Sequence, residues 1–242
     1  MGAGMGQPPV QQAGQSAMGA VLDMFNVLHE PDAVFNRIKQ RPRILVPWLV
    51  FSVFAMAFGY LMRPFQHAAM ETLRASLPPE QAARMSGGDS ITGLLVVPVI
   101  LLLGLAIGAG LLALGVALTG AQARYKTLLS VLAYSCSTYV LFSAVTFAVL
   151  MTRGVGQVVD FTDLRAPIGL DLLAPGVGLY LGAVLNAINP FSIWGVWLAG
   201  TGISVTHGTS RATGIVVTAV TFIICVAIQS APLIFLSMAL KR

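Results

Sequence analysis

Long apolar runs without a single charged side chain constrain this chain more than any other feature. A helix needs roughly 20 mostly apolar residues to cross a hydrocarbon core about 30 Å thick. Four runs meet or approach that length, and they cover residues 44–62, 91–119, 128–150 and 214–240. A fifth run at residues 191–206 is shorter but also free of charge. Each run predicts a transmembrane helix.

The composition agrees with this reading of the runs. Only 10% of the 242 residues are charged and 56% are hydrophobic, whereas a soluble domain has roughly 25% charged residues. We therefore expect an all-α integral membrane protein, a polytopic helical bundle with five spans over residues 44–240. Residues 172–188 contain Pro175 and three glycines. They predict an interfacial helix, a re-entrant segment or a sixth span.

Two further segments precede the first span. Residues 1–20 consist mainly of Gly, Gln, Ala and Pro without charge, which predicts a disordered tail. Residues 21–43 form an amphipathic and basic juxtamembrane segment. Its apolar residues recur at helical spacing on both sides of Pro31, which predicts two short amphipathic helices that lie on the membrane surface.

Basic residues gather in two segments, one before the first span and one in the short loop before the third. Arg37, Lys39, Arg41 and Arg43 come directly before the first span, which favours a cytoplasmic N-terminus. The same cations, together with those of the short loop before the third span, are candidates for contact with anionic lipid headgroups. Their simpler role is to anchor the topology. The candidate headgroup contacts are Arg37, Lys39, Arg41, Arg43, Arg124 and Lys126.

Residue patterns typical of proton relays, metal sites or catalytic sites are largely missing from the sequence. The five apolar cores contain no Asp, Glu, Lys, Arg or His, which argues against proton-coupled transport. The three histidines lack the spacing of metal ligands, and Cys136 and Cys225 lie inside predicted spans. Hydroxyl side chains form a stripe on the third span, which favours helix packing over a substrate path. We therefore predict no catalytic residue, no metal, no cofactor and no nucleic-acid partner.

Small residues recur at the spacing that lets transmembrane helices approach closely. Gly104 and Gly108 form a GxxxG pair in the second span, and Gly200 and Gly202 lie in the fourth. Close packing at such residues drives helix association in lipid. The pattern predicts packing positions at all four glycines without saying whether the neighbouring helix belongs to this chain or to another.

Three segments together resemble the Yip1 family of multi-spanning membrane proteins. The first is "LHEPDAVFNRIKQRPRILVPWLV", which is similar to the start of bacterial-type members. The second is "TGAQARYKTLLSVLAYSCSTYVL", with Gly120, Tyr125 and the "AYS" at residues 133–135. The third is "NPFSIWGVWLAGTGISVTHGTSRA", with Asn189, Phe191 and Trp194. The "DLYGP"-type motif and long N-terminal domain of eukaryotic members are missing here, so their link to Rab GTPases is not carried over.

The resemblance implies a five-span bundle without established catalytic residues, in the cytoplasmic membrane of a bacterium. We therefore expect a non-enzymatic protein that binds or organises membrane lipids or other membrane proteins, self-association included. The alternative is a passive transporter or channel for a small solute or lipid. That alternative requires a broken helix or a polar cavity at membrane depth, and residues 172–190 are its candidate.

Overall fold

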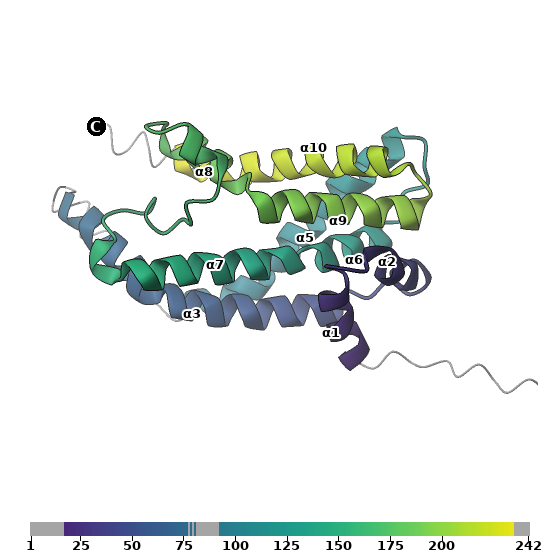
Figure 1. Ribbon diagram of the computed structural model, residues 1–242, viewed down its shortest axis with the longest axis horizontal. Coiled ribbons are helices and arrows are strands. Elements are labelled where there is room, and N and C mark those ends of the chain that lie inside the picture. Colours follow the sequence, from purple (N-terminus) through teal and green to yellow (C-terminus); the bar gives the residue numbers. More distant parts are fainter. Residues whose placement is uncertain (1–16, 77, 79, 81–91, 235–242) are drawn as a thin grey trace, which may run out of the picture.

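A bundle of long helices, with two short helices at one end, makes up the computed structural model (Figure 1). The structure describes residues 17–76, 78, 80 and 92–234. The element order is α1 (Ala17–Asn26), α2 (Pro31–Gln40), α3 (Leu45–Ser76), α5 (Thr92–Leu118), α6 (Tyr125–Ser135), α7 (Ser137–Arg153), η1 (Val155–Gln157), η2 (Leu170–Leu173), α8 (Leu179–Ala187), α9 (Pro190–His207) and α10 (Arg211–Ser230). The predicted all-α polytopic bundle is thus confirmed.

Four helical stretches are long and apolar enough to cross a membrane. They are Leu45–Ala75, Gly93–Leu118, Tyr125–Arg153 and Arg211–Ile234. A fifth arises when α8 and α9, which are bent by 57° at their junction, count as one broken span. With nine residues, α8 is only about 14 Å long, so residues 172–188 do not form a sixth span by themselves.

Several boundaries differ from those expected. The helix α1 begins at Ala17, inside the segment predicted to be a disordered tail, whose residues 1–16 lie outside the described residues. The described part of the last predicted span ends before residues 235–240, which are likewise outside. The helix α3 does not end at Met62 but continues through Pro64 to Ser76. At about 48 Å it is longer than the hydrocarbon core, so part of it projects beyond the core.

Tertiary packing explains why α3 continues past its proline. Proline removes one backbone donor from the helix, but the residues that follow it are buried. Phe65 and Ala69 pack in a cluster with Leu150 of α7, and the Phe65 ring meets Phe147 edge to face at 6.4 Å between centroids. These contacts favour the continued helix over an end at the proline.

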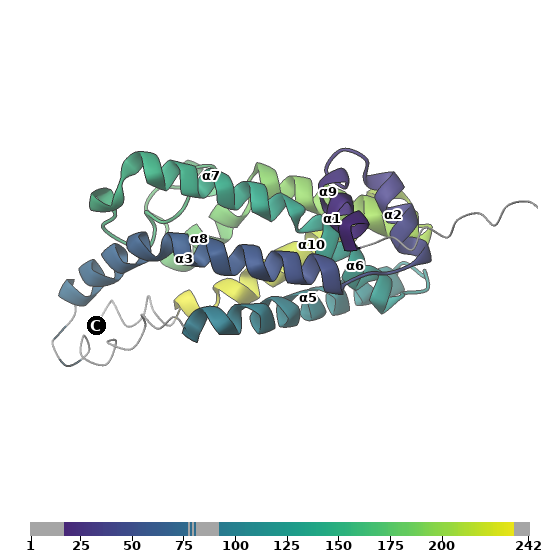
Figure 2. The same cartoon turned by 90° about the horizontal axis from the view of Figure 1, so that it is seen from below.

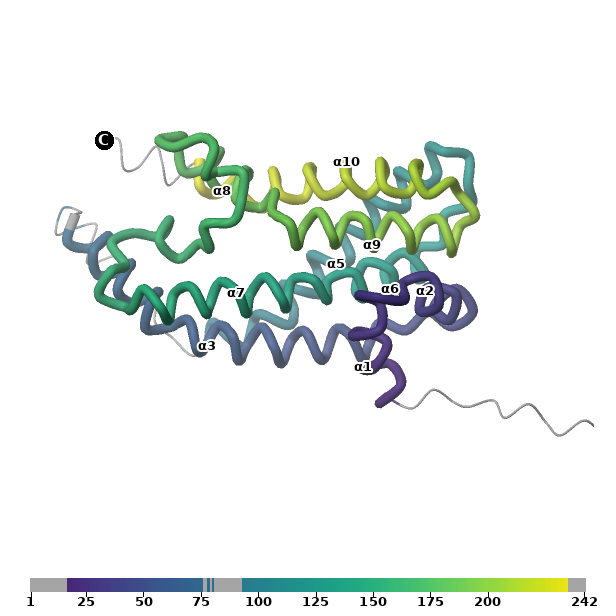
Figure 3. Tube along the Cα trace, viewed as in Figure 1, coloured from purple at the N-terminus to yellow at the C-terminus, as the bar shows by residue number. Residues whose placement is uncertain are grey.

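The stretch of α6 and α7 packs against both α3 and α9, between which it lies in the tube view (Figure 3). Of its most apolar window 56% is buried, compared with 17% for α5 and for α10. The helix is interrupted at Cys136, a break that the sequence analysis did not predict. There the Thr138 hydroxyl donates to the Ser135 carbonyl at 3.3 Å, and Gly195 of α9 lies against that hydroxyl.

Candidate functional site: the basic end of the bundle

Both short N-terminal helices and the two short interhelical loops meet at one end of the bundle, which we call the basic end (Figure 2). It comprises α1, α2, the segment between α2 and α3, the loop before α6 and the loop before α10. Seven basic and three acidic side chains give it a net formal charge of +4. They are Arg37, Lys39, Arg41, Arg43, Arg124, Lys126 and Arg211, against Asp23, Glu30 and Asp32.

Among the described residues, the opposite end has a small excess of acidic side chains. Charged residues outside the described ones, Arg84, Asp89, Lys241 and Arg242, carry a further net charge of +2. The described side chains of the opposite end are four basic and five acidic, a net formal charge of −1. They are Arg63, Arg74, Arg153 and Arg165, against Glu71, Glu80, Asp160, Asp163 and Asp171. The charge asymmetry therefore runs along the long axis of the molecule, and the structure collects the six predicted headgroup candidates at the same end.

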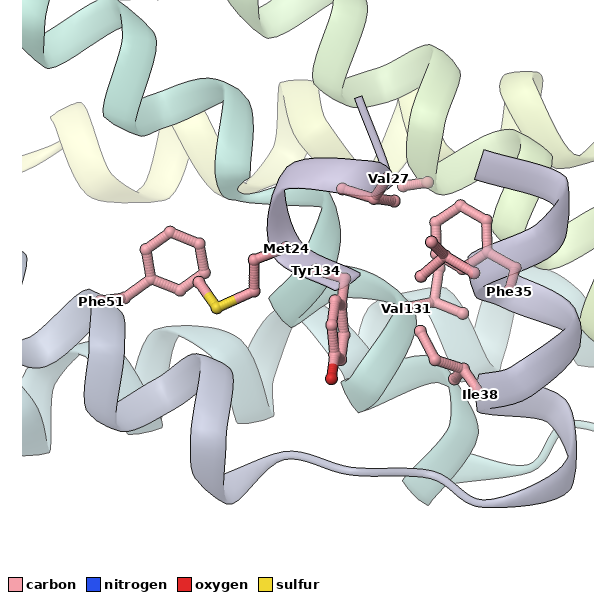
Figure 4. Close-up of a cluster of buried hydrophobic side chains, with 9 residues drawn as sticks. Met24, Val27, Phe35, Ile38, Phe51, Val131 and Tyr134 are labelled. Carbon is pink, nitrogen blue, oxygen red and sulfur yellow. The ribbon is translucent and has the colours of Figure 1, made fainter. Parts of the chain in front are cut away.

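A hydrophobic cluster holds α1 and α2 against the bundle (Figure 4). Val34 and Phe35 of α2 are fully buried, and Ile38 is 3% exposed. Their partners include Val131 and Tyr134 of α6. The expectation that both short helices lay their apolar faces on the membrane is therefore wrong for α2, because this face is covered by protein.

Phe35 occupies a space that a glycine leaves open. A Cβ atom at Gly202 of α9 would lie 2.6 Å from the Val131 side chain and 2.9 Å from the Phe35 ring. Any larger residue at this position would have to displace one of them. Gly202 thus lies where α2, α6 and α9 meet.

The other three predicted packing glycines have different surroundings. A Cβ at Gly200 would lie 2.6 Å from the Cα of Ile215, and one at Gly214 would overlap the Gly200 carbonyl, so α9 and α10 touch backbone to backbone. A Cβ at Gly108 would lie 2.8 Å from Leu132. A Cβ at Gly104 would meet no other part of the described chain within 4 Å, so no described helix packs closely at Gly104.

Two ion pairs tie the basic end together. The Arg37 guanidinium donates to Asp23 at 2.6 Å and joins α2 to α1. Arg211 at the start of α10 donates to both carboxylate oxygens of Asp32 at 2.9 and 3.1 Å. The first pair is partly buried, whereas both members of the second are more than half exposed. Arg37 is therefore engaged within the protein.

Arg124 secures the loop before α6 to the C-terminus of α9. Its guanidinium donates to the Thr206 carbonyl, which places a cation at the negative end of the helix dipole. Its backbone N–H donates to Nε2 of His207 at 3.2 Å. Nδ1 of His207 then carries the ring proton and donates to the Thr206 hydroxyl at 2.7 Å. That hydroxyl donates in turn to the Gly202 carbonyl at 2.6 Å.

His207 was missed as an architectural residue by the sequence analysis, which tested it only as a metal ligand. A histidine in the last turn of a helix is a known signal for interaction with the final carbonyl groups and the helix dipole. The sequence therefore contained the signal, but it could not identify the partner of His207, the backbone N–H of Arg124 on a loop 83 positions away.

Three of the candidate cations are left for other partners. Lys39, Arg41 and Lys126 are exposed, and within the described part of the chain no carboxylate lies within 4 Å of them. Arg43 is half-buried and lies within electrostatic range of Tyr134. Arg124 is also exposed, but its guanidinium donates to the Thr206 carbonyl. The set of exposed cations without such a partner among the described residues is thus smaller than the six residues predicted from the sequence.

The hydroxyl stripe of the third span faces the interior of the bundle. Ser135 donates to the Val131 carbonyl at 2.8 Å and Thr146 to the Phe142 carbonyl at 2.9 Å, both within their own helix. Ser143 is buried without a hydrogen-bond partner. Among the described residues, no group of three or more His, Cys, Asp or Glu side chains is placed to hold a metal ion.

At the junction of α8 and α9, the Asn189 side chain binds backbone groups that the helix break releases, and Asn186 ties α8 to the segment before it. The Asn189 side chain accepts hydrogen bonds from the N–H groups of Phe191 and Ser192 at 3.0 and 3.1 Å and so caps α9. The buried Asn186 amide donates to the Ala166 carbonyl at 3.2 Å and to Asp171 at 3.1 Å. Protein groups therefore occupy the helix N-terminus that a bound solute would need.

Comparison with known proteins gives one match. The model of the Yip1 domain matches residues 25–231, which is most of the chain and includes both α2 and the whole described bundle up to the end of α10. No curated protein and no solved structure matches.

Proposed function

The chain belongs to the Yip1 family, and from this premise we propose that it is a non-enzymatic integral membrane protein that binds anionic lipid headgroups at its basic end and organises lipids and other membrane proteins around it. The observation that carries this proposal is the asymmetry of charge, +4 at the basic end against −1 among the described residues of the opposite end.

The physical basis is the surface potential of an anionic leaflet. A Lys or Arg near such a surface contributes about 1 kcal/mol of attraction. Lys39, Arg41 and Lys126 are exposed at the basic end without a carboxylate within 4 Å among the described residues. Their charges are thus available to headgroup phosphates, whereas Arg37 and Arg211 form ion pairs with Asp23 and Asp32.

The same asymmetry supports an orientation. Basic residues beside spans are retained on the cytoplasmic side of the membrane. We therefore infer that the basic end and the N-terminus face the cytoplasm, and that the protein resides in a bacterial cytoplasmic membrane. Attachment of a membrane-impermeant label to Lys39 in intact cells would contradict this orientation.

The lipid proposal is tested by mass spectrometry of the protein with bound lipid, after reconstitution in mixed phosphatidylglycerol and phosphatidylcholine. The triple variant Lys39→Gln, Arg41→Gln, Lys126→Gln should lose the preference for the anionic lipid, by roughly fivefold per charge. The matched control Arg63→Gln, Arg153→Gln, Arg165→Gln removes the same charge from the opposite end and should keep it. Equal losses in both variants would refute a site at the basic end.

A passive transporter or channel is the second candidate, and the 57° bend between α8 and α9 is the observation that favours it. Broken helices form substrate sites in many transporters because their backbone groups are free to bind the solute. Here the Asn189 side chain binds such groups instead, namely the N–H groups of Phe191 and Ser192 and the carbonyl groups of Asn186 and Ala187. Flux through proteoliposomes that is lost in Asn189→Ala, with lipid preference unchanged, would favour this candidate over ours.

A further inference from the structure

The helix α1 is apolar on two opposite faces. Its inner face consists of Ala20 and Met24 and continues into Val27, directly after the helix, and all three are at most 5% exposed. Its outer face consists of Met18, Leu22 and Phe25, spaced for one side of a helix and 67%, 54% and 61% exposed. Single exposed apolar residues are ordinary, but three on one helical face form a continuous apolar stripe.

The inner face fixes how α1 is turned. Met24 and Val27 belong to the cluster that also contains Phe51 of α3 and Phe35 of α2, and Figure 4 shows the Met24 side chain directed toward the Phe51 ring. Asp23, on the same side, binds Arg37 at 2.6 Å. These contacts hold Met18, Leu22 and Phe25 away from the bundle.

The position of Phe51 sets the depth of α1. Phe51 follows the first residue of α3 by six positions, which is about 9 Å along the helix axis. The helix α1 therefore packs on the side of a transmembrane helix near its end, not on top of it. Leu45, Leu49 and Val53 of the same helix are 70%, 51% and 67% exposed and belong to its lipid-facing surface. Phe51 faces α1 and lies on the other side of α3 from Leu49 and Val53. The outer face of α1 therefore points away from the bundle at the depth of the first turns of α3.

We propose that α1 is an interfacial helix, whose residues Met18, Leu22 and Phe25 insert among the lipids of the leaflet at the basic end. The occupant of the apolar stripe is lipid because α1 packs beside a transmembrane helix, about 9 Å along its axis from its first residue, and lies next to the basic segment. An inserted amphipathic helix binds according to lipid composition and curvature. This gives the protein a sensor of lipid packing in one leaflet, independent of headgroup selection by Lys39, Arg41 and Lys126.

The test uses the full chain in phosphatidylethanolamine and phosphatidylglycerol vesicles, with a photo-crosslinking phenylalanine analogue placed at one position at a time. At Leu22 we expect adducts with lipid acyl chains. At Met24, two positions along the chain and on the inner face, we expect crosslinks within the chain and no lipid adduct above background. Crosslinks from Leu22 to a second copy or to another protein, or no adduct at all, would overturn the proposal.

A second comparison distinguishes insertion of α1 from the ordinary contact that any transmembrane helix makes with lipid. Val99 on α5 is 55% exposed and serves as a reference for ordinary contact with acyl chains. The ratio of lipid adducts at Leu22 to those at Val99 should rise when large vesicles are replaced by small, strongly curved ones. An unchanged ratio would contradict packing sensing. The triple variant at Lys39, Arg41 and Lys126 should leave the Leu22 adducts in place, so the two proposals fail separately.

Discussion

The helices α1 and α2 are alike in length and position but differ in what covers them. Both have ten residues, precede the first span and carry apolar residues at helical spacing. In α2 the apolar side chains of Val34, Phe35 and Ile38 are buried by protein. In α1 one apolar face is buried and the opposite one is left open. Amphipathic spacing thus shows that a face needs an apolar environment, but not whether protein or lipid supplies it.

The difference arises from the shape of the bundle beside each helix. The helix α2 lies over a place where Gly202 of α9 has no side chain, so the Phe35 ring fits between α6 and α9. The helix α1 lies on the outside of α3, with a protein neighbour on one side only. The predictions below test this difference, and they run from the largest expected effect to the smallest.

Replacement of Phe35 by alanine should have the largest effect on stability. A buried phenylalanine replaced by alanine costs about 3–5 kcal/mol. The matched change Phe25→Ala on the outer face of α1 should stay within about 0.5 kcal/mol in detergent. Unfolding can be followed with a thiol-reactive dye, because Cys136 at the break between α6 and α7 and Cys225 in α10 are free and half-buried. Equal losses in the two variants would contradict the contrast between the helices.

A side chain at position 202 should expel Phe35. In Gly202→Val the new atoms meet Val131 and Phe35, and overpacking of this kind costs about 1–3 kcal/mol. The cost should shrink in a Phe35→Ala background, where the space is already free. Gly104→Val is the control, since a Cβ there meets nothing within 4 Å. Strict additivity of Gly202→Val and Phe35→Ala in the same unfolding assay would speak against a shared space.

Loss of the Asp23 charge should loosen α1 from α2. Asp23→Asn removes the ionic part of a partly buried bond to Arg37, and hydrogen bonds to charged groups are worth about 1.5–3 kcal/mol. Glu30→Gln removes an equal charge from an exposed position and should change little. Proteolysis at the α1–α2 connection, measured on folded protein, should accelerate in Asp23→Asn alone. The same acceleration in Glu30→Gln would mean that overall charge, not the pair, holds α1.

The smallest effect is expected at the exposed pair between α2 and α10. Arg211→Gln breaks the contact with Asp32, and exposed pairs contribute about 0.2–1 kcal/mol. Because salt at about 1 M screens charges beyond roughly 3 Å, the difference from the unaltered protein should vanish there. A loss larger than that of Asp23→Asn would show that α2 is held mainly by this pair.

The sequence allowed the spans to be located but not their interruptions. Hydropathy identified α3, α5, α10 and the stretch of α6 and α7, since lipid tolerates only apolar helical segments of sufficient length. The break at Cys136 depends on the Thr138 hydroxyl and on Gly195 from another helix. The continuation of α3 beyond Pro64 depends on Phe147. Gly195 and Phe147 are far along the chain from the segments that they contact, and no local pattern contains such contacts.

The candidate site, too, was predictable from the sequence only in part. The basic residues were visible in the sequence as a cluster before the first span and a second group in a loop. Their sorting required the structure, which pairs Arg37 with Asp23, binds Arg124 to Thr206 and leaves Lys39, Arg41 and Lys126 exposed. An ion pair depends on a few ångströms between side chains of different helices. The spacing of charges along a chain does not determine that distance.

By itself the sequence determined that this protein is an all-α membrane bundle of the Yip1 family, because length, charge-free runs and the order of three motifs are properties of the chain alone. Tertiary structure decided which amphipathic helix is covered by protein and which is left for lipid. The physical reason is that apolar burial has no direction. It requires only that water be removed, and the shape of the neighbouring helices determines whether a side chain or an acyl chain removes it.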